Sequence, residues 1–260
     1  MPGEPVPVRE LTVDSLPVAV YGSTEAMGLA AALAAREALT AAIAERGEAN
    51  VILATGNSQL AFLHALRELD GIAWRRVRAF HMDEYLGLPA GHTASFPRFL
   101  HEHFLDHVPL GEFHPVPGDQ DMAEENCRAY EALLRAHPAD LVALGWGENG
   151  HLAFNDPPYA FFDDPHWVKV IELAEASRKQ QVGEGHFPTL ASVPTHAVTL
   201  TIPALLAAKQ VLCIVPEARK VPAVQACLYG PVTEDHPGSV LRTVRHARLY
   251  LDPASAAGLR

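Results

Sequence analysis

Residues 144–157, Leu-Gly-Trp-Gly-Glu-Asn-Gly-His-Leu-Ala-Phe-Asn-Asp-Pro, form the segment of the chain best suited to proton transfer. Three glycines within six residues are typical of a tight loop, and they are costly unless a close approach requires them. We expect this loop to press His151 and the polar pair Glu148 and Asn149 towards a ligand. Asp156 follows His151 by five residues and can orient its ring.

A second segment, residues 80–88, has the sequence Phe-His-Met-Asp-Glu-Tyr-Leu-Gly-Leu and places two carboxylates, Asp83 and Glu84, directly after a β-rich run. Neighbouring side chains in an extended segment point to opposite sides. One carboxylate can therefore face a ligand and act as a base, while the other pairs with a backbone or cationic group. An ordinary acidic turn after a strand is the alternative.

A third segment, residues 51–58, runs from a buried-strand pattern into a polar loop before a helix that begins near Gln59. The loop consists of Thr55, Gly56, Asn57 and Ser58. Its glycine lets the backbone approach an anion, its other side chains offer donors, and the helix start adds unpaired N–H groups. The pattern fits a phosphate cup, or a Ser or Asn that simply caps its own helix.

Other patterns in the chain carry less chemistry. His101, His103 and His107 cluster, but Glu102 stands directly before His103, so the H-E-x-x-H spacing is not met. His103 and His107 can share a helix face that binds a metal or only faces solvent. The sequence has no G-x-G-x-x-G that opens a helix after a strand, no P-loop lysine and no G-x-S-x-G elbow. We therefore expect no metal, no nucleotide cofactor and no serine nucleophile.

The elements that must position these residues alternate between short β-rich runs and longer helical patterns, which is the rhythm of βαβ units. The predicted strands are 18–21, 51–54, 77–81, 141–144, 168–171, 197–201, 211–215 and 247–251, and the predicted helices are 25–46, 59–69, 124–136 and 221–229. They predict an α/β fold with a doubly wound, mostly parallel, Rossmann-like sheet and helices on both faces, in a single domain spanning residues 1–260. In such sheets ligands bind beyond the carboxyl ends of the strands.

The amino-acid composition limits the kinds of partner that the protein can bind. Acidic side chains outnumber basic ones by 31 to 20, a net charge of −11, which disfavours nucleic acid and anionic membrane surfaces. An anionic ligand must then be attracted by a few local groups. Three cysteines without C-x-x-C spacing are typical of reduced thiols, and neither an export signal nor an apolar run of membrane-spanning length is evident. We expect a cytoplasmic enzyme; a homo-oligomer stays possible.

At its three polar segments the sequence resembles the glucosamine-6-phosphate deaminase family, whose relatives include the 6-phosphogluconolactonases. Residues 54–58 are similar to the phosphate loop of that family, residues 81–88 to its Met-Asp-Glu-Tyr-x-Gly-Leu signature, and residues 145–157 to its Gly-x-Gly-x-x-Gly-His-x-Ala-Phe-Asn-acid-Pro signature. Residues 193–200 resemble a family strand. Lys220 falls where the family has a phosphate-binding lysine.

This resemblance implies a metal-free aldose–ketose isomerisation coupled to loss of ammonia, which yields fructose 6-phosphate from glucosamine 6-phosphate. Asp83 is expected to move a proton between C2 and C1, and His151 to assist ring opening at O5. The remaining catalytic candidates are Asp156, which holds the histidine, and Asn149. The substrate-binding candidates are Thr55, Gly56, Asn57, Ser58, Glu84, Gly147, Arg178 and Lys220.

The chain departs from the family pattern at two places. Asn149 stands where many members have an aspartate, with Glu148 beside it, and Asp156 is shorter than the usual glutamate. The Thr-Arg-x-x-Asn-x-Arg-Phe segment of the family is replaced by residues 177–187, so its second arginine has no clear counterpart. The candidates to replace that arginine are Arg178, Lys179 and His186.

Two other functions compete with the deaminase. A 6-phosphogluconolactonase would use His151 to activate water at an ester carbonyl, but its pattern has an arginine at the position of Tyr85 and a Ser-Leu-Phe-type run at residues 154–156. Sugar-phosphate-sensing domains of some bacterial regulators share the general fold. The acidic, proline-rich residues 1–18 do not resemble the helix-turn-helix that normally accompanies such a domain.

Overall fold

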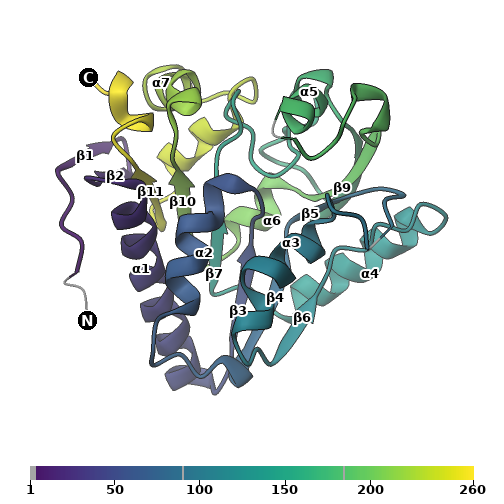
Figure 1. The fold of residues 1–260 in the computed structure, drawn as a ribbon, viewed down its shortest axis with the longest axis horizontal. Coiled ribbons are helices and arrows are strands. Elements are labelled where there is room, and N and C mark those ends of the chain that lie inside the picture. The colour runs from purple at the N-terminus through teal and green to yellow at the C-terminus, as the bar shows by residue number, and fades with distance from the viewer. Residues whose placement is uncertain (1–3, 90, 184) are drawn as a thin grey trace.

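The computed structural model describes residues 4–89, 91–183 and 185–260, which build an eight-stranded sheet and a smaller three-stranded one (Figure 1). The large sheet has the order β1-β2-β11-β10-β7-β3-β4-β6. Its strands are β1 (Arg9–Val13), β2 (Leu16–Val20), β3 (Ala49–Leu53), β4 (Val77–His81), β6 (Glu112–His114), β7 (Leu141–Leu144), β10 (Gln210–Val215) and β11 (Ala247–Leu251). β1 runs antiparallel to β2, and the other neighbours pair in parallel. The predicted mostly parallel α/β sheet is confirmed.

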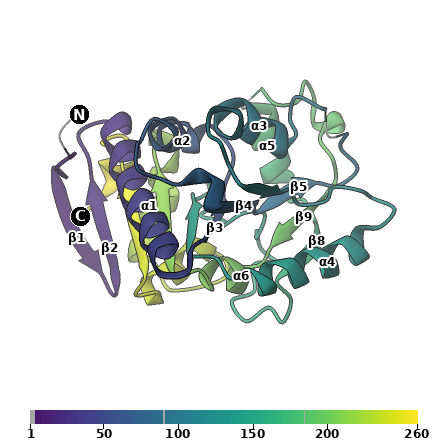
Figure 2. The ribbon, with the colours of Figure 1, turned by 90° about the horizontal axis from the view of Figure 1, so that it is seen from below.

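Helices cover both faces of this sheet, as predicted, because alternate residues of each buried strand point to opposite sides (Figure 2). One face packs against α1 (Thr24–Arg46), α2 (Leu60–Arg67) and α3 (Phe96–His103). The other face packs against α4 (Ala123–Ala136), α6 (Ile202–Leu206) and α7 (Val221–Tyr229). Gly28 lets α1 approach α2, because a Cβ there would lie 2.6 Å from the Ala61 carbonyl carbon.

The apolar helix α1 has the length and hydropathy of a membrane span. It is alanine-rich, and the face that carries Met27, Ala31, Ala35 and Leu39 is buried in the core against the large sheet. Its Ser23 side chain accepts a hydrogen bond from the Ala26 N–H, and Gly47 ends the helix in the left-handed conformation with φ of 84°. The helix is therefore a core element of the fold in this structure.

The smaller sheet corrects one part of the expected topology. It has the order β5-β9-β8, formed by β5 (Asp83–Tyr85), β9 (His196–Leu200) and β8 (Val168–Glu172), and both pairings are antiparallel. The β-rich runs at 168–171 and 197–201 were expected to continue the parallel sheet. They leave it because β8 keeps one half-exposed face, which an antiparallel sheet tolerates and a doubly covered parallel sheet does not.

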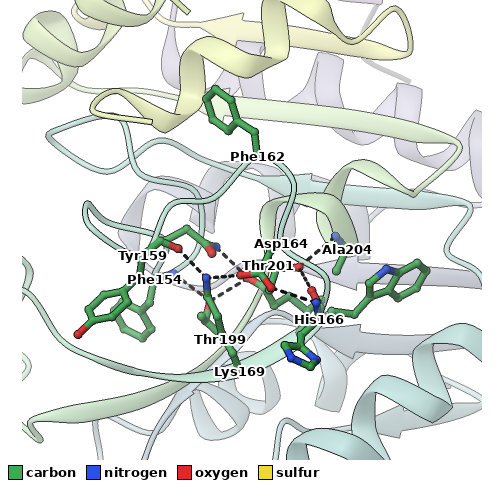
Figure 3. Close-up of polar contacts among 12 residues, drawn as sticks. Phe154, Tyr159, Phe162, Asp164, His166, Lys169, Thr199, Thr201 and Ala204 are labelled. Atoms are coloured by element: carbon green, nitrogen blue, oxygen red, sulfur yellow. Dashed lines mark hydrogen bonds and ion pairs between the residues drawn. The ribbon is translucent and has the colours of Figure 1, made fainter. Parts of the chain in front are cut away.

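Between β7 and β8 the chain follows an irregular path that a partly buried polar cluster holds in place. The Lys169 cluster consists of Tyr159, Asp164, His166, Lys169 and Thr201. The Lys169 Nζ donates to the Tyr159 carbonyl at 2.6 Å and to Asp164 Oδ2 at 2.7 Å (Figure 3). The Thr201 hydroxyl donates to the His166 carbonyl at 2.7 Å and accepts from the Ala204 N–H, which caps α6. These contacts give a proline- and phenylalanine-rich segment one conformation without a helix or strand.

The histidine cluster lies on α3 and on the following turn η3 (Leu105–His107). His101 Nδ1 contacts Asp106, His103 packs against the Phe99 ring, and His107 Nε2 contacts the Glu102 carbonyl. These separate partners leave the three rings without a common ligand position. Within the described residues no three histidine, cysteine, aspartate or glutamate side chains gather as metal ligands.

Candidate active site

A cleft with an empty volume of about 960 Å³, its open side included, lies at the carboxyl ends of β3, β4, β7 and β10. This is the edge where a doubly wound sheet binds its ligands. Its walls contain residues from all three polar segments of the sequence. The lining residues are Ala54, Thr55, Gly56, Asn57, Ser58, Gln59, Met82, Asp83, Thr93, Ala94, Ser95, Phe96, Phe99, Glu102, Gly145, Trp146, Gly147, His151, Ala153, Phe154, Gln181, His186, Arg219 and Lys220.

The loop after β3 forms one wall of the cleft. Gly56 has φ of 97°, a conformation that favours glycine, and the turn η1 (Asn57–Gln59) follows it before α2 begins. No side chain caps either η1 or α2, so the capping explanation for Asn57 and Ser58 does not hold. The loop instead lines the cleft with its backbone and its polar side chains. This is the geometry expected of an anion cup.

Gln59 fixes this loop to the rest of the cleft. Its side chain is buried, and its Nε2 donates to the Ile214 carbonyl at 3.4 Å and to Ser58 Oγ at 3.3 Å. Ile214 lies near the end of β10, so one amide links the loop that follows β3 to the end of β10. In the sequence, only the position of Gln59 beside the loop hints at this role.

Asp83 reaches the cleft because the chain leaves β4, passes Met82 and begins β5 in the smaller sheet. The residue is only 7% exposed. Burial, helped by the nearby charge of Glu84, raises the pKa of Asp83 to about 8. A carboxyl group of this kind can hold or release a proton close to neutral pH, as a general acid–base group requires.

Glu84 points away from the cleft, as expected for a neighbour of Asp83 in an extended segment. Its Oε1 accepts from the Tyr85 N–H at 2.7 Å, and its Oε2 accepts from Ser95 Oγ at 2.9 Å and the Phe96 N–H at 3.1 Å. Burial outweighs these bonds and raises the pKa of Glu84 to about 7. Glu84 does not line the cleft, so its assignment to substrate binding is corrected: it satisfies the N-terminus of α3.

The loop between β7 and the proline-rich segment brings His151 to the cleft. His151 Nδ1 lies 3.0 Å from Asp156 Oδ1, as predicted from their spacing. Ser177 Oγ donates to the other carboxylate oxygen at 2.9 Å. Burial acts to raise the pKa of Asp156, but the charge of His151 and the hydrogen bonds lower it to about 2. The ionised carboxylate favours a proton on Nδ1 and leaves Nε2 as the acceptor for a ligand.

Asn149 completes this arrangement. Its Nδ2 donates to Asp156 Oδ1 at 2.7 Å, and its Oδ1 accepts from the His151 N–H at 3.1 Å. The amide therefore orders both partners without adding a charge. Gly147 is required for a different reason, because a Cβ on it would lie 2.1 Å from Cε1 of the His151 ring. The glycine-rich sequence thus lets the ring lie flat against its own loop.

Lys220 supplies a cationic side chain to the cleft. It ends η5 (Ala218–Lys220) after β10, lines the cleft and is only 3% exposed, so it is not a solvated residue of the first helical turn. Glu217, just before η5, has φ of 81°, and its N–H donates to the Asp252 carboxylate. A non-glycine residue in this conformation stores strain, which is typical of functional turns.

Arg178 does not lie at the cleft. It belongs to α5 (Glu175–Gly183), and its Nη2 donates to the carbonyls of Leu190 at 2.7 Å and Val193 at 3.1 Å. Its assignment to substrate binding is therefore corrected, because the guanidinium holds the chain before β9. Lys179 is exposed and pairs with Glu175, whereas His186 lines the cleft.

The structure adds lining residues that the sequence did not single out. The main additions are Gln59, Thr93, Glu102, Gln181 and Arg219. Arg219 stands directly before Lys220, so its position soon after a predicted strand is a sequence signal for the cleft. The others come from loops and from α3 and α5, where no local pattern marks a residue as part of a cleft.

Comparison with known proteins gives consistent results. A family model described as glucosamine-6-phosphate isomerases/6-phosphogluconolactonase matches residues 22–250. The glucosamine-6-phosphate deaminase of Bacillus cereus is 37% identical over 190 residues, which cover 73% of this chain and 70% of the relative.

Solved structures extend the likeness to the whole fold. A monomeric glucosamine-6-phosphate deaminase superposes with a TM-score of 0.84 at 26% identity, covering 93% of this chain and 99% of that one. The 6-phosphogluconolactonase of Trypanosoma brucei superposes with a TM-score of 0.77 at 19% identity, covering 97% and 100%. The second similarity concerns the fold alone.

Proposed function

Since the chain belongs to the family of glucosamine-6-phosphate isomerases and 6-phosphogluconolactonases, we propose that it is a deaminase that converts glucosamine 6-phosphate and water to fructose 6-phosphate and ammonia. The proposal is carried by the content of one cleft. The cleft contains a buried acid with a raised pKa, a histidine oriented by a carboxylate, and an anion cup together with the cationic Lys220. Together these groups supply what an aldose–ketose proton transfer on a phosphorylated sugar requires.

The reaction begins with the cyclic sugar. Nε2 of His151 accepts the proton of the O1 hydroxyl and returns it to the O5 oxygen, so that the ring opens to the aldehyde. Asp156 and Asn149 keep the imidazole in the tautomer that this exchange needs.

Asp83 then acts on the open chain. Its carboxylate removes the proton from C2 while the aldehyde oxygen O1 takes a proton from the ammonium group on C2, which gives an enolamine with a hydroxyl on C1. The resulting carboxyl group then delivers its proton to C1, and C2 becomes the carbon of a protonated imine. Water adds to this imine and ammonia leaves, which gives the ketone of fructose 6-phosphate. Proton transfers of this kind contribute about 10²- to 10⁴-fold each to the rate.

The phosphate group is held at the other end of the cleft. The loop of Thr55, Gly56, Asn57 and Ser58 offers neutral donors, and the buried Lys220 adds a full positive charge. We propose that the chain works as one cytoplasmic domain, classed as a hydrolase of carbon–nitrogen bonds, without a metal or organic cofactor. Its assembly state can be measured by light scattering.

The proposal is tested by incubating the purified protein with glucosamine 6-phosphate, its N-acetyl form and 6-phosphogluconolactone. We expect ammonia and fructose 6-phosphate in equal amounts from the first compound only. Release of acid from the lactone, without ammonia from the amino sugar, would identify a lactonase. Binding of the amino sugar without turnover would identify a sensing domain.

A further inference from the structure

The cleft contains two cationic side chains from the Lys and Arg residues of the described chain, Arg219 and Lys220, and only the second has a role in the reaction proposed above. A sugar phosphate at neutral pH carries close to two negative charges. The protein as a whole has a net charge of −11, so its own field opposes such a ligand. One lysine and neutral donors leave this charge incompletely balanced.

Arg219 is held beside the cleft by two glutamates. Its Nε donates to Glu217 Oε2 at 2.6 Å, and its Nη1 lies 3.3 Å from Glu148 Oε1. The side chains are 30% exposed for Arg219, 38% for Glu217 and 48% for Glu148. Ion pairs at this exposure contribute little to stability, so an incoming dianion can displace one of them at little cost.

The two glutamates connect Arg219 to different parts of the site. Glu217 belongs to the strained turn before Lys220, and Glu148 belongs to the loop that carries His151. The guanidinium therefore connects the turn that ends in Lys220 with the loop that carries His151. A planar guanidinium can also form two parallel hydrogen bonds to phosphate oxygens, which a lysine cannot do.

We propose that Arg219 is a second phosphate-binding residue, and that the phosphate of the substrate replaces Glu148 as the partner of its guanidinium. The inference rests on the proposed function for the identity of the sugar, but the phosphate contact itself does not require turnover. It makes Glu148 a competitor of the ligand, so that the two residues have opposite effects on phosphate affinity.

The experiment measures binding of inorganic phosphate to the full-length protein by calorimetry, and its inhibition constant where the protein turns over glucosamine 6-phosphate. Arg219→Gln is expected to weaken phosphate binding about ten-fold or more. Glu148→Gln is expected to strengthen it about two- to five-fold, because the competing charge is removed. Lys179→Gln, an exposed cation paired with Glu175 outside the cleft, is the matched control and should stay within about two-fold of the native protein.

Phosphate affinity that is unchanged in Arg219→Gln would overturn the inference, as would a native protein that binds no phosphate. Equal weakening by Arg219→Gln and Glu148→Gln would also overturn it, because it would show that their ion pair only supports the loop. The proposed function fails separately: a native protein that releases no ammonia, yet shows these opposite shifts in phosphate binding, would disprove the deaminase and keep the phosphate contact.

Discussion

The cleft and the Lys169 cluster both bury charged side chains near the smaller sheet, but they use them differently. In the Lys169 cluster the ammonium finds a carboxylate and a carbonyl of the protein, at 2.7 Å and 2.6 Å. At the cleft both influences on Asp83, burial and the charge of Glu84, raise its pKa, and no opposing influence balances them. Charge paired inside the protein stabilises a conformation, whereas a buried acid whose pKa is raised towards neutrality beside a cavity is available for proton transfer.

His151 and Asp156 combine features of the Lys169 cluster and of Asp83. Their hydrogen bond is supported on the Asp156 side, because Asn149 and Ser177 also donate to the carboxylate. On the other side, the ring lines the cleft. The comparison therefore predicts that substitutions at the cleft reduce activity more than stability, and that substitutions in the Lys169 cluster do the reverse.

The largest of the contrasting effects is expected for His151→Gln. The amide can keep a hydrogen bond to Asp156 but cannot exchange protons, so we expect turnover of glucosamine 6-phosphate to fall by at least about 10²-fold. Initial rates of ammonia release measure this. His166→Gln is the matched control, because His166 is exposed and its hydrogen bonds in the Lys169 cluster come from its backbone N–H and carbonyl. Comparable losses in both variants would remove the distinction between the two regions.

Lys220→Met is expected to act on binding. A charge-assisted hydrogen bond contributes about 1.5–3 kcal/mol, so the KM for glucosamine 6-phosphate should rise about ten- to a hundred-fold with little change in kcat. Unphosphorylated glucosamine, already a poor substrate, should respond much less. If the variant affects both sugars equally, or neither of them, Lys220 does not contact the phosphate.

Lys169→Met should show the opposite balance. It leaves the Asp164 carboxylate, whose side chain is only 5% exposed, without its ammonium partner. We expect the free energy of unfolding to fall by about 2 kcal/mol, since such unpaired groups are costly. Urea denaturation measures the fall. The kcat per folded molecule should stay within about two-fold of the native value, and a selective loss of kcat would place Lys169 in the catalytic machinery.

Exhaustive chelation of metal ions is expected to leave kcat unchanged. The proposed reaction needs only proton transfer, and within the described residues no set of three metal-binding side chains gathers. The measurement is kcat before and after dialysis against a chelator. Activity that is lost and then restored by zinc or magnesium would contradict this expectation.

The same contrast shows how far the sequence alone could predict the molecule. Strands such as β7 and β10 were located because buried parallel strands are near-continuous apolar runs. The run at 197–201 has the same appearance, yet β9 pairs with β5 in the antiparallel sheet. Local composition does not encode which partner a strand will find.

Among the site residues, those that directly follow strands or glycine-rich turns were predictable, as Asp83, His151 and Lys220 illustrate. Arg178 was assigned to substrate binding from the family resemblance, as a candidate to replace an arginine of the family pattern. However, its helix turns the guanidinium towards the carbonyls of Leu190 and Val193. The role of Lys169 gave no signal at all, because its partners lie in an irregular segment. Side-chain direction on helices and in loops depends on tertiary contacts that a single sequence does not reveal.

Asp83→Asn is expected to change the stability of the protein as well as its activity. The folded-state pKa of Asp83 is about 8, above the usual value of 3.8, so its contribution to stability is fully present below pH 4 and is lost as the pH rises to about 8. Asparagine does not ionise. The variant should therefore gain stability relative to the native protein over this range, which thermal unfolding at several pH values can follow.

The turnover of glucosamine 6-phosphate by Asp83→Asn at pH 8, where much of the native carboxyl group is ionised, tests the central claim most directly. The claim is that Asp83, a buried group held at a cost to stability, is required for the proton transfer. We predict that kcat falls by at least about 10²-fold in a folded protein whose melting temperature is not lower than that of the native enzyme. A folded variant with turnover close to the native value would contradict the account.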